Sequence, residues 1–128
     1  MVMYGFWRST AAFRVRMALN LKALPFAERM IDLDAGEQHG ESYRAINTQG
    51  ALPTVVFPDG TRLTQSLAIL EYLEELHPAP ALLPPDDPAG RARVRSLALL
   101  WAADHHALIV PRVRKYLTDT AGLEADAA

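Results

Sequence analysis

Two adjacent hydroxyl side chains, Ser9 and Thr10, stand where an apolar strand pattern over residues 2–7 gives way to a helical pattern. The first turn of a helix leaves several backbone N–H groups without partners, and the aligned peptide dipoles place roughly half a positive charge there. An anion or thiolate held at this turn would be stabilised by about 0.3–1 kcal/mol. The pair could therefore bind such a group, or it could simply cap the helix.

The amino-acid composition shows that this chain has no thiol of its own. The 128-residue sequence contains no cysteine, which excludes disulfides, a cysteine nucleophile and thiolate metal sites, so a thiol would have to arrive with a ligand. A net charge of −2 provides no field that attracts nucleic acid or an acidic membrane. No apolar run approaches the roughly 20 residues that span a bilayer, and the N-terminus does not resemble a signal peptide. We therefore expect a cytoplasmic protein.

The elements around the hydroxyl pair predict a parallel crossover. Apolar residues on both faces of the segment 2–7 are typical of an inner strand, and residues 12–22 carry one apolar stripe at helical spacing. A second strand follows at residues 29–33, and a short helix is predicted over residues 41–46. A strand-helix-strand unit within one sheet has parallel strands.

The next segment predicts a hairpin and a helix. The segment 51–57 predicts a strand with Pro53 at its very start, and a second strand at Arg62–Thr64 returns antiparallel to it after a Pro-Asp-Gly turn. Gln65-Ser66 then opens a helix with Ser66 as its N-cap. The helical period predicts that Ile69, Tyr72, Leu73 and Leu76 face the core and that Glu71, Glu74 and Glu75 face solvent. The order βαβ-α-ββα is that of an α/β thioredoxin-like domain over residues 1–77.

The remaining sequence predicts a linker and an incomplete helical domain. Residues 78–88 are rich in proline and contain Leu82-Leu83, which we expect to pack on a domain surface. Asp87 followed by proline predicts a helix start, and residues 89–128 contain two helical pieces interrupted at Pro111. Two pieces cannot form an independent bundle. Either the second domain is truncated, or another chain covers its apolar residues Leu97, Leu100, Trp101 and Leu108.

Three features converge at one end of the predicted sheet: the hydroxyl pair, a Leu-Pro before the third strand, and a Gln-Ser at the start of the last helix. With these features the chain resembles the glutathione transferases, specifically the zeta class, which includes the bacterial maleylacetoacetate isomerases. The similar segments are residues 7–16 (WRSTAAFRVR), 18–22 (ALNLK), 36–39 (GEQH), 49–53 (QGALP), 65–75 (QSLAILEYLEE), 82–84 (LLP) and 91–95 (RARVR).

The resemblance implies glutathione as the cofactor. Ser9 matches the residue whose hydroxyl bonds the glutathione thiolate, with Thr10 beside it, and a helix start supports this by lowering a thiol pKa. Gln38 matches a polar residue at the glycyl end of glutathione. Leu52 would pair its backbone N–H and C=O with the cysteinyl part, and Pro53 is expected to follow a cis bond.

The remaining implied contacts lie further along the chain. Gln65 and Ser66 match residues that take the γ-glutamyl carboxylate at a helix start. His106 matches a residue lining the glutathione site, and Arg14 and Arg112 are assigned to an acidic substrate.

Some positions depart from the family pattern. Ala11 stands where relatives often carry cysteine, which excludes a cysteine-assisted step. Ile109 and Val110 replace two asparagines, which removes donors that could hold a dicarboxylate or glutathione. His105 and His106 are adjacent and diverge on a helix, so we expect no metal site.

The resemblance implies a glutathione-dependent cis–trans isomerase of maleylacetoacetate type, an activity of aromatic amino acid catabolism. The expected substrate is a small electrophile, a dicarboxylate, and the expected assembly is a homodimer without nucleic acid or membrane partners. A generic glutathione transferase needs the same thiolate and is the first alternative. A non-catalytic binding module with this fold is the second.

Overall fold

The hydroxyl pair follows an inner strand of a four-stranded sheet in the computed structural model, which describes residues 1–124. The strands are β1 (Val2–Gly5), β2 (Ala27–Met30), β3 (Thr54–Val56) and β4 (Arg62–Thr64), in the order β2-β1-β3-β4. β1 pairs parallel with β2 and antiparallel with β3, and β3 pairs antiparallel with β4. The predicted parallel crossover and hairpin are therefore confirmed.

The second strand lies earlier in the chain than predicted. β2 ends at Met30, so Ile31 and Leu33 of the predicted strand lie beyond it. All four β2 residues are exposed, and β2 stands at the edge of the sheet. An exposed edge strand does not need apolar alternation, which is why that pattern misplaced it.

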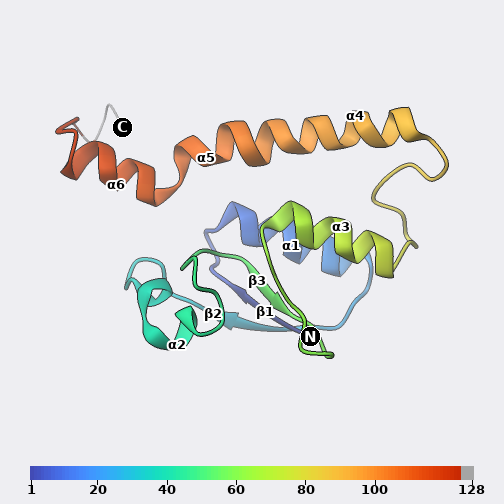
Figure 1. Ribbon diagram of the computed structural model, residues 1–128, viewed down its shortest axis with the longest axis horizontal. Helices are drawn as coiled ribbons and strands as arrows, with labels where there is room; N and C mark the ends of the chain where they lie inside the picture. The colour runs from blue at the N-terminus through green and yellow to red at the C-terminus, as the bar shows by residue number, and fades with distance from the viewer. Residues whose placement is uncertain (125–128) are drawn as a thin grey trace. The chain divides into compact units, whose positions relative to one another are not determined.

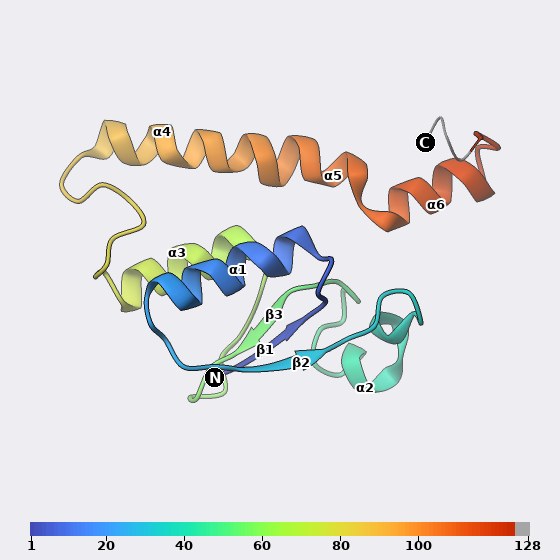
Figure 2. The same cartoon turned by 180° about the vertical axis from the view of Figure 1, so that it is seen from behind.

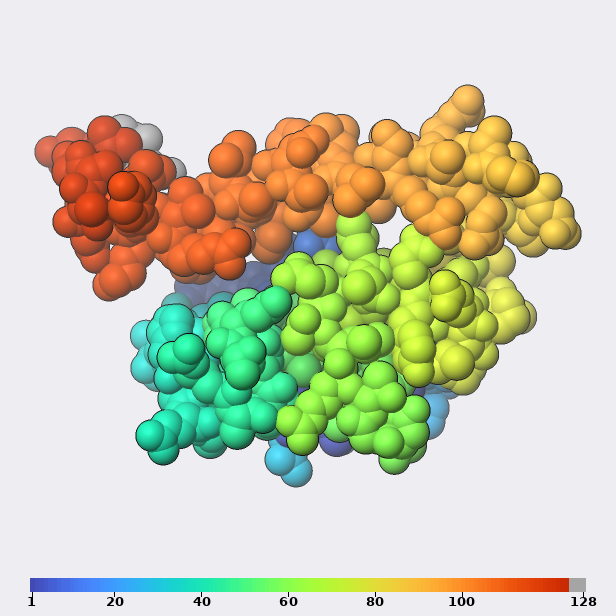
Figure 3. Space-filling view, viewed as in Figure 1, coloured from blue at the N-terminus to red at the C-terminus, as the bar shows by residue number. Residues whose placement is uncertain are grey.

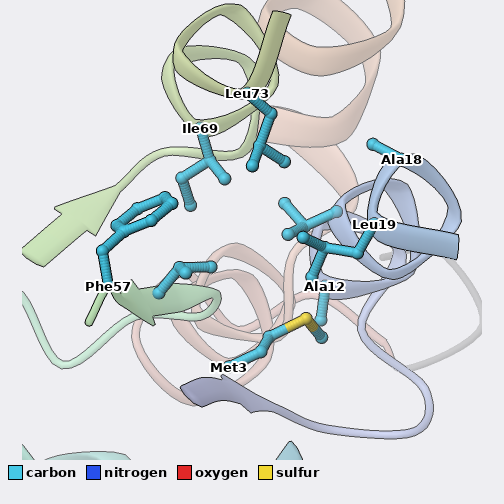
Figure 4. Packing of buried hydrophobic residues seen from close by; sticks show 9 residues of the cluster. Met3, Ala12, Ala18, Leu19, Phe57, Ile69 and Leu73 are labelled. Atoms are coloured by element: carbon cyan, nitrogen blue, oxygen red, sulfur yellow. The ribbon is translucent and has the colours of Figure 1, made fainter. Parts of the chain in front are cut away.

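Helices α1 (Thr10–Leu21) and α3 (Ser66–Leu76) lie side by side on one face of the sheet (Figure 1, and from behind in Figure 2). Figure 4 shows side chains from both helices meeting those of the strands. The buried cluster consists of Met3, Ala12, Val15, Ala18, Leu19, Val55, Phe57, Ile69 and Leu73. Burying one large aliphatic side chain contributes about 1.5–3 kcal/mol, so this cluster fixes the two helices on the sheet.

The opposite face of the sheet is covered by α2 (Glu41–Arg44), which follows the 3₁₀ turn η1 (Glu37–His39). Neighbouring residues on a strand point to opposite faces, so Tyr4 points away from the Met3 cluster. The ring of Tyr4 contacts that of Tyr43 in α2, with centroids 5.8 Å apart. The Tyr43 hydroxyl also lies 2.8 Å from Thr54 Oγ1 of β3. In Figure 3 the turquoise segment around α2 lies beside the yellow-green segment that follows β3 in the chain. The predicted βαβ-α-ββα order of a thioredoxin-like domain is confirmed.

Two predictions for α3 are wrong. Ser66 is the first helical residue, and the N-cap is Gln65. The outward face also differs, because Glu74 is only 8% exposed while Leu76 is 51% exposed. The last turn of α3 therefore turns a carboxylate, and not a leucine, toward the protein interior.

The reason is a buried ion pair between Glu74 and Lys22, the residue that caps the end of α1. Lys22 Nζ donates to Glu74 Oε2 at 2.7 Å, and also to the carbonyl oxygens of His77 (2.5 Å) and Pro80 (2.9 Å). All three ammonium hydrogens thus have acceptors, which a buried cation requires.

The same carboxylate binds the segment that follows α3, residues 77–83, here called the strap. Glu74 accepts the backbone N–H of Leu82 and of Leu83, at distances of 3.0–3.1 Å. Leu83 is 8% exposed and Leu82 packs against the core cluster, so the expectation for these leucines is confirmed. A compact unit accordingly extends from Met1 through Leu83.

A second compact unit begins at Pro84 and is helical. It contains α4 (Pro88–Leu99), a π-helical turn (Leu100–His105), α5 (His106–Ile109) and α6 (Pro111–Asp119). Asp87 caps α4 by accepting the N–H of Gly90 at 2.9 Å, and Pro111 begins a new helix, as predicted. The apolar residues singled out from the sequence are exposed, at 57% for Leu97, 41% for Leu100, 64% for Trp101 and 70% for Leu108. Within residues 1–124, no helix combines the length and hydropathy needed to cross a membrane.

Candidate functional site

Ser9 lies between β1 and α1 and caps that helix. Its Oγ accepts the N–H of Ala12 at 3.2 Å, so the predicted capping role is confirmed. The hydroxyl proton remains available to a ligand, because accepting that bond uses a lone pair and not the O–H. The first turn of α1 begins with the exposed Thr10 and contains no acidic residue that would neutralise the helix dipole. This turn therefore favours an anionic group.

The sheet register brings three predicted binding segments to one end of the sheet. Ser9 follows β1, while β3 runs antiparallel to β1 and begins at Thr54, just after Leu52. Thr54 is paired in turn with Thr64, the last residue of β4, and α3 begins directly afterwards with Gln65 as its N-cap. The hydroxyl turn, the Leu52 loop and the start of α3 therefore lie together.

The Leu52 loop is held by a buried polar network. The Leu52–Pro53 bond is cis, as the resemblance implied. The carbonyl of Ala51 accepts hydrogen bonds from the Tyr43 hydroxyl (2.7 Å) and from Asn47 Nδ2 (2.8 Å). Burial raises the pKa of Tyr43, so its hydroxyl remains a donor. The backbone N–H and C=O of Leu52 are engaged by no backbone group of residues 1–124, which leaves them available to a ligand.

Gln38 lies in η1 beside this loop. Gly50 has a φ of 59°, and a Cβ there would come within 2.9 Å of the Gln38 carbonyl oxygen, so glycine permits the close approach. The Gln38 side-chain Oε1 is buried and has no hydrogen-bond partner in the described part of the chain. Its Nε2 lies 3.2 Å from Nε2 of His39. A buried acceptor without a donor is uncommon and marks a position where a ligand group would fit.

The start of α3 has no capping side chain. Gln65 has a φ of 67° and a ψ of 110°, a region that non-glycine residues rarely occupy, and its Nε2 donates to Gln49 Oε1 at 3.3 Å. Ser66 is 6% exposed, and its Oγ accepts hydrogen bonds from both Nε and Nη2 of Arg14, each at 3.2 Å. First-turn N–H groups without a capping side chain suit a carboxylate ligand.

The backbone strain at Gln65 can be tested by comparing Gln65→Gly with Gln65→Ala. A non-glycine residue at such a φ costs about 1–3 kcal/mol, and glycine relieves it at an entropic cost of roughly 0.5–1 kcal/mol. Both variants lose the side chain, but only glycine relieves the strain. We expect the glycine variant to unfold in urea with a free energy about 1 kcal/mol higher than the alanine variant. An alanine variant of equal or greater stability would show that Gln65 is unstrained.

Two further predicted site residues lie in the second unit. His106 is the first residue of α5, and Arg112 lies in the first turn of α6. Their assignment to the glutathione and substrate sites stays a prediction. His105, next to His106, has its Nδ1 2.9 Å from the Leu100 carbonyl oxygen, within the π-helical turn. Among residues 1–124, no group of three or more His, Asp or Glu side chains could hold a metal ion.

The polar network around the Leu52 loop is the part of the site that sequence reasoning missed. Asn47 carries a signal, because it opens a polar turn, but that signal indicates only the turn. Tyr43 carries none, because its role depends on β1, β3 and the short helix meeting in space. The contact between Arg14 and Ser66 likewise joins residues 52 positions apart.

Comparison with known proteins places this chain in a family. Residues 8–76 match the family described as "Glutathione S-transferase, N-terminal domain". The probable maleylacetoacetate isomerase of Vibrio cholerae is 44% identical over 126 residues, which cover 96% of this chain and 57% of that protein. The crystal structure of maleylacetoacetate isomerase from Methylobacterium extorquens AM1, with bound malonate and GSH, matches with a TM-score of 0.94 at 55% identity. The matched region covers 98% of this chain and 58% of the isomerase chain.

A second solved structure extends the likeness to a related enzyme. The holo structure of maleylpyruvate isomerase, described as a bacterial glutathione S-transferase of the zeta class, has a TM-score of 0.92 at 40% identity and covers 97% of this chain and 57% of that one. The chain thus spans somewhat more than half the length of the relatives it matches. On the family match and these relatives, the chain belongs to the glutathione S-transferase family.

Proposed function

We propose that this chain contributes the glutathione-binding part of a glutathione-dependent cis–trans isomerase of the maleylacetoacetate type. The observation that carries the proposal is the convergence of Ser9, Leu52 and the uncapped start of α3 at one end of the sheet. Relatives at 40–55% identity are named as maleylacetoacetate or maleylpyruvate isomerases, and one contains GSH together with malonate, a dicarboxylate.

The residues present fit glutathione, a tripeptide with two carboxylates and a thiol. Gln38 Oε1 has no donor among residues 1–124, and it would receive an N–H at the glycyl end. Leu52 has backbone groups that would pair with the cysteinyl part. Gln65 and Ser66 stand at a helix start that would hold the γ-glutamyl carboxylate. Ser9 would donate its hydroxyl proton to the sulfur.

In the proposed reaction, glutathione supplies the nucleophile, and the protein stabilises its ionised form and binds the substrate. Bound glutathione supplies a thiolate that adds to a double bond conjugated to a carbonyl, permits rotation about the resulting single bond, and leaves again. Ser9 and the dipole of α1 favour the ionised sulfur and so lower the thiol pKa, with the Thr10 hydroxyl in the same turn. Arg112 would pair with a substrate carboxylate, and His106 would line the site.

The test is a parallel assay of maleylacetoacetate and maleylpyruvate, each with and without glutathione. We expect isomerisation of at least one substrate only when glutathione is present, and retention of the protein on immobilised glutathione. Conjugation of other electrophiles without isomerisation would identify a generic transferase. A folded protein that is not retained would contradict the proposal and indicate a non-catalytic module.

We also propose a homodimer in the cytoplasm. The exposed apolar residues of the second unit, Leu97, Trp101 and Leu108 among them, support association, because burying such a patch is favourable. A cytoplasmic location agrees with the reducing, glutathione-rich character of that compartment. Light scattering that gives a monomer mass would overturn the dimer, and cell fractionation tests the location.

A further inference from the structure

Arg14 is a partly buried cation that has no carboxylate partner among the residues the structure describes. Its Nε and Nη2 both donate to Ser66 Oγ at 3.2 Å, so the guanidinium is directed at the start of α3. Arg16, two residues further along α1, instead forms an ion pair with Glu28. Burial lowers the pKa of the Arg14 guanidinium, because removing water disfavours the charged form. A cation in such a position is stabilised when an anion comes close.

The contact also decides what the Ser66 hydroxyl can do. A hydroxyl has one O–H donor and two acceptor lone pairs, whereas a guanidinium can only donate. Because two N–H groups of Arg14 point at Ser66 Oγ, its lone pairs are occupied and its own proton must go to another acceptor. The first residue of α3 is therefore an O–H donor, beside helix N–H groups that no side chain caps. Such a site accepts a carboxylate and offers nothing to an amine.

We propose that Arg14 is a positioning residue, which fixes Ser66 as an obligate donor and supplies the positive charge behind it. The start of α3 is thereby made selective for the α-carboxylate of the γ-glutamyl group. This inference rests on the proposed function and adds a role to it, because Arg14 acts through Ser66 and not by direct contact with the isomerised substrate.

The experiment compares two ligands by titration calorimetry. Glutathione is the first, and 4-aminobutyryl-cysteinyl-glycine, which is glutathione without the α-carboxylate, is the second. We expect Arg14→Met to weaken glutathione binding by about 10- to 100-fold, as for loss of a hydrogen bond to a charged group. The affinity for the second ligand should not change. Arg14→Lys should recover part of the loss, because it keeps the charge. Arg16→Met, which removes a guanidinium from the same helix, is the matched control and should leave both affinities unchanged.

Each outcome has a distinct meaning. If Arg14→Met lost the same affinity for both ligands, the role of Arg14 would be merely structural. If it lost affinity for neither, Arg14 would have no role in binding. Both results overturn the inference. A wild type that binds the two ligands equally well would overturn it too, while leaving the proposed function intact. A wild type that binds neither would overturn the proposed function and the inference with it. If Arg14→Met does not fold, Ser66→Ala must show the same selective loss.

Discussion

Ser9→Ala is expected to lower isomerase turnover by about 10²- to 10³-fold, the size of effect seen when one donor to a developing anion is removed. The reason is that the Ser9 hydroxyl proton has no acceptor within residues 1–124, where Ser9 Oγ instead accepts the Ala12 N–H. Its removal leaves only the helix dipole to favour the thiolate, so the thiol pKa should rise toward its ordinary value of about 8.5. The KM for glutathione should change little, because the Leu52 loop and the start of α3 remain. Steady-state kinetics between pH 6 and pH 9 measure both quantities, and the residual activity should increase with pH more steeply than in the wild type.

A second substitution separates this chemistry from helix capping. Ser9→Ala also removes the N-cap of α1, which costs about 1 kcal/mol of stability. Ser9→Asp keeps a capping acceptor but places a carboxylate beside the thiol. Its free energy of unfolding should therefore equal that of the wild type, while its turnover should fall as strongly as that of Ser9→Ala. Thr10→Ala should cause a smaller loss, because Thr10 is exposed and does not cap. Wild-type turnover in Ser9→Ala, or in Ser9→Asp, would remove Ser9 from its proposed role.

The parts of the fold that were predictable from the sequence are those set by local rules. The helical stripe of α1, the Ser9 cap, the Leu52–Pro53 pair just before β3 and the hairpin turn each depend on residues within a few positions of one another. The same is true of Asp87 at the start of α4. Their order along the chain then determined the topology, because a parallel crossover has few alternatives.

The predictions that failed depend on segments far apart in the sequence. A serine before a helical run is normally its N-cap, but Gln65 adopts a left-handed backbone conformation that no sequence signal for glutamine indicates. Ser66 then becomes the first helical residue, where its hydroxyl meets Arg14. The helical period likewise placed Glu74 outside, since nothing in α3 itself shows that the strap returns and requires an acceptor there.

Lys22→Met is expected to lower the free energy of unfolding of the first unit by about 3–5 kcal/mol, because it leaves the buried Glu74 carboxylate without its cation. Burial by itself would raise the pKa of Glu74, but Lys22 and the two strap N–H groups together lower it below its ordinary value of 4.5. A carboxyl whose pKa is lower in the folded state stabilises the fold fully above the unfolded value and loses that contribution as the pH falls through the folded one. The advantage of the wild type over Lys22→Met should therefore be largest near neutral pH and should decrease below pH 4.5.

Urea unfolding of the full chain at several pH values measures this difference, and Arg8→Met provides the matched control. Arg8 forms an ion pair with Asp34 in the same unit, but the two side chains are 51% and 65% exposed. Exposed pairs contribute about 0–1 kcal/mol, so the same change from cation to methionine should have little effect there. Because Lys22 also binds the His77 and Pro80 carbonyls, its loss should release the strap first, which hydrogen exchange at the Leu82 and Leu83 amides would detect as faster exchange. If Lys22→Met were no less stable than Arg8→Met, or if those two amides kept their protection, the ion pair would not be what holds the strap against the rest of the first unit.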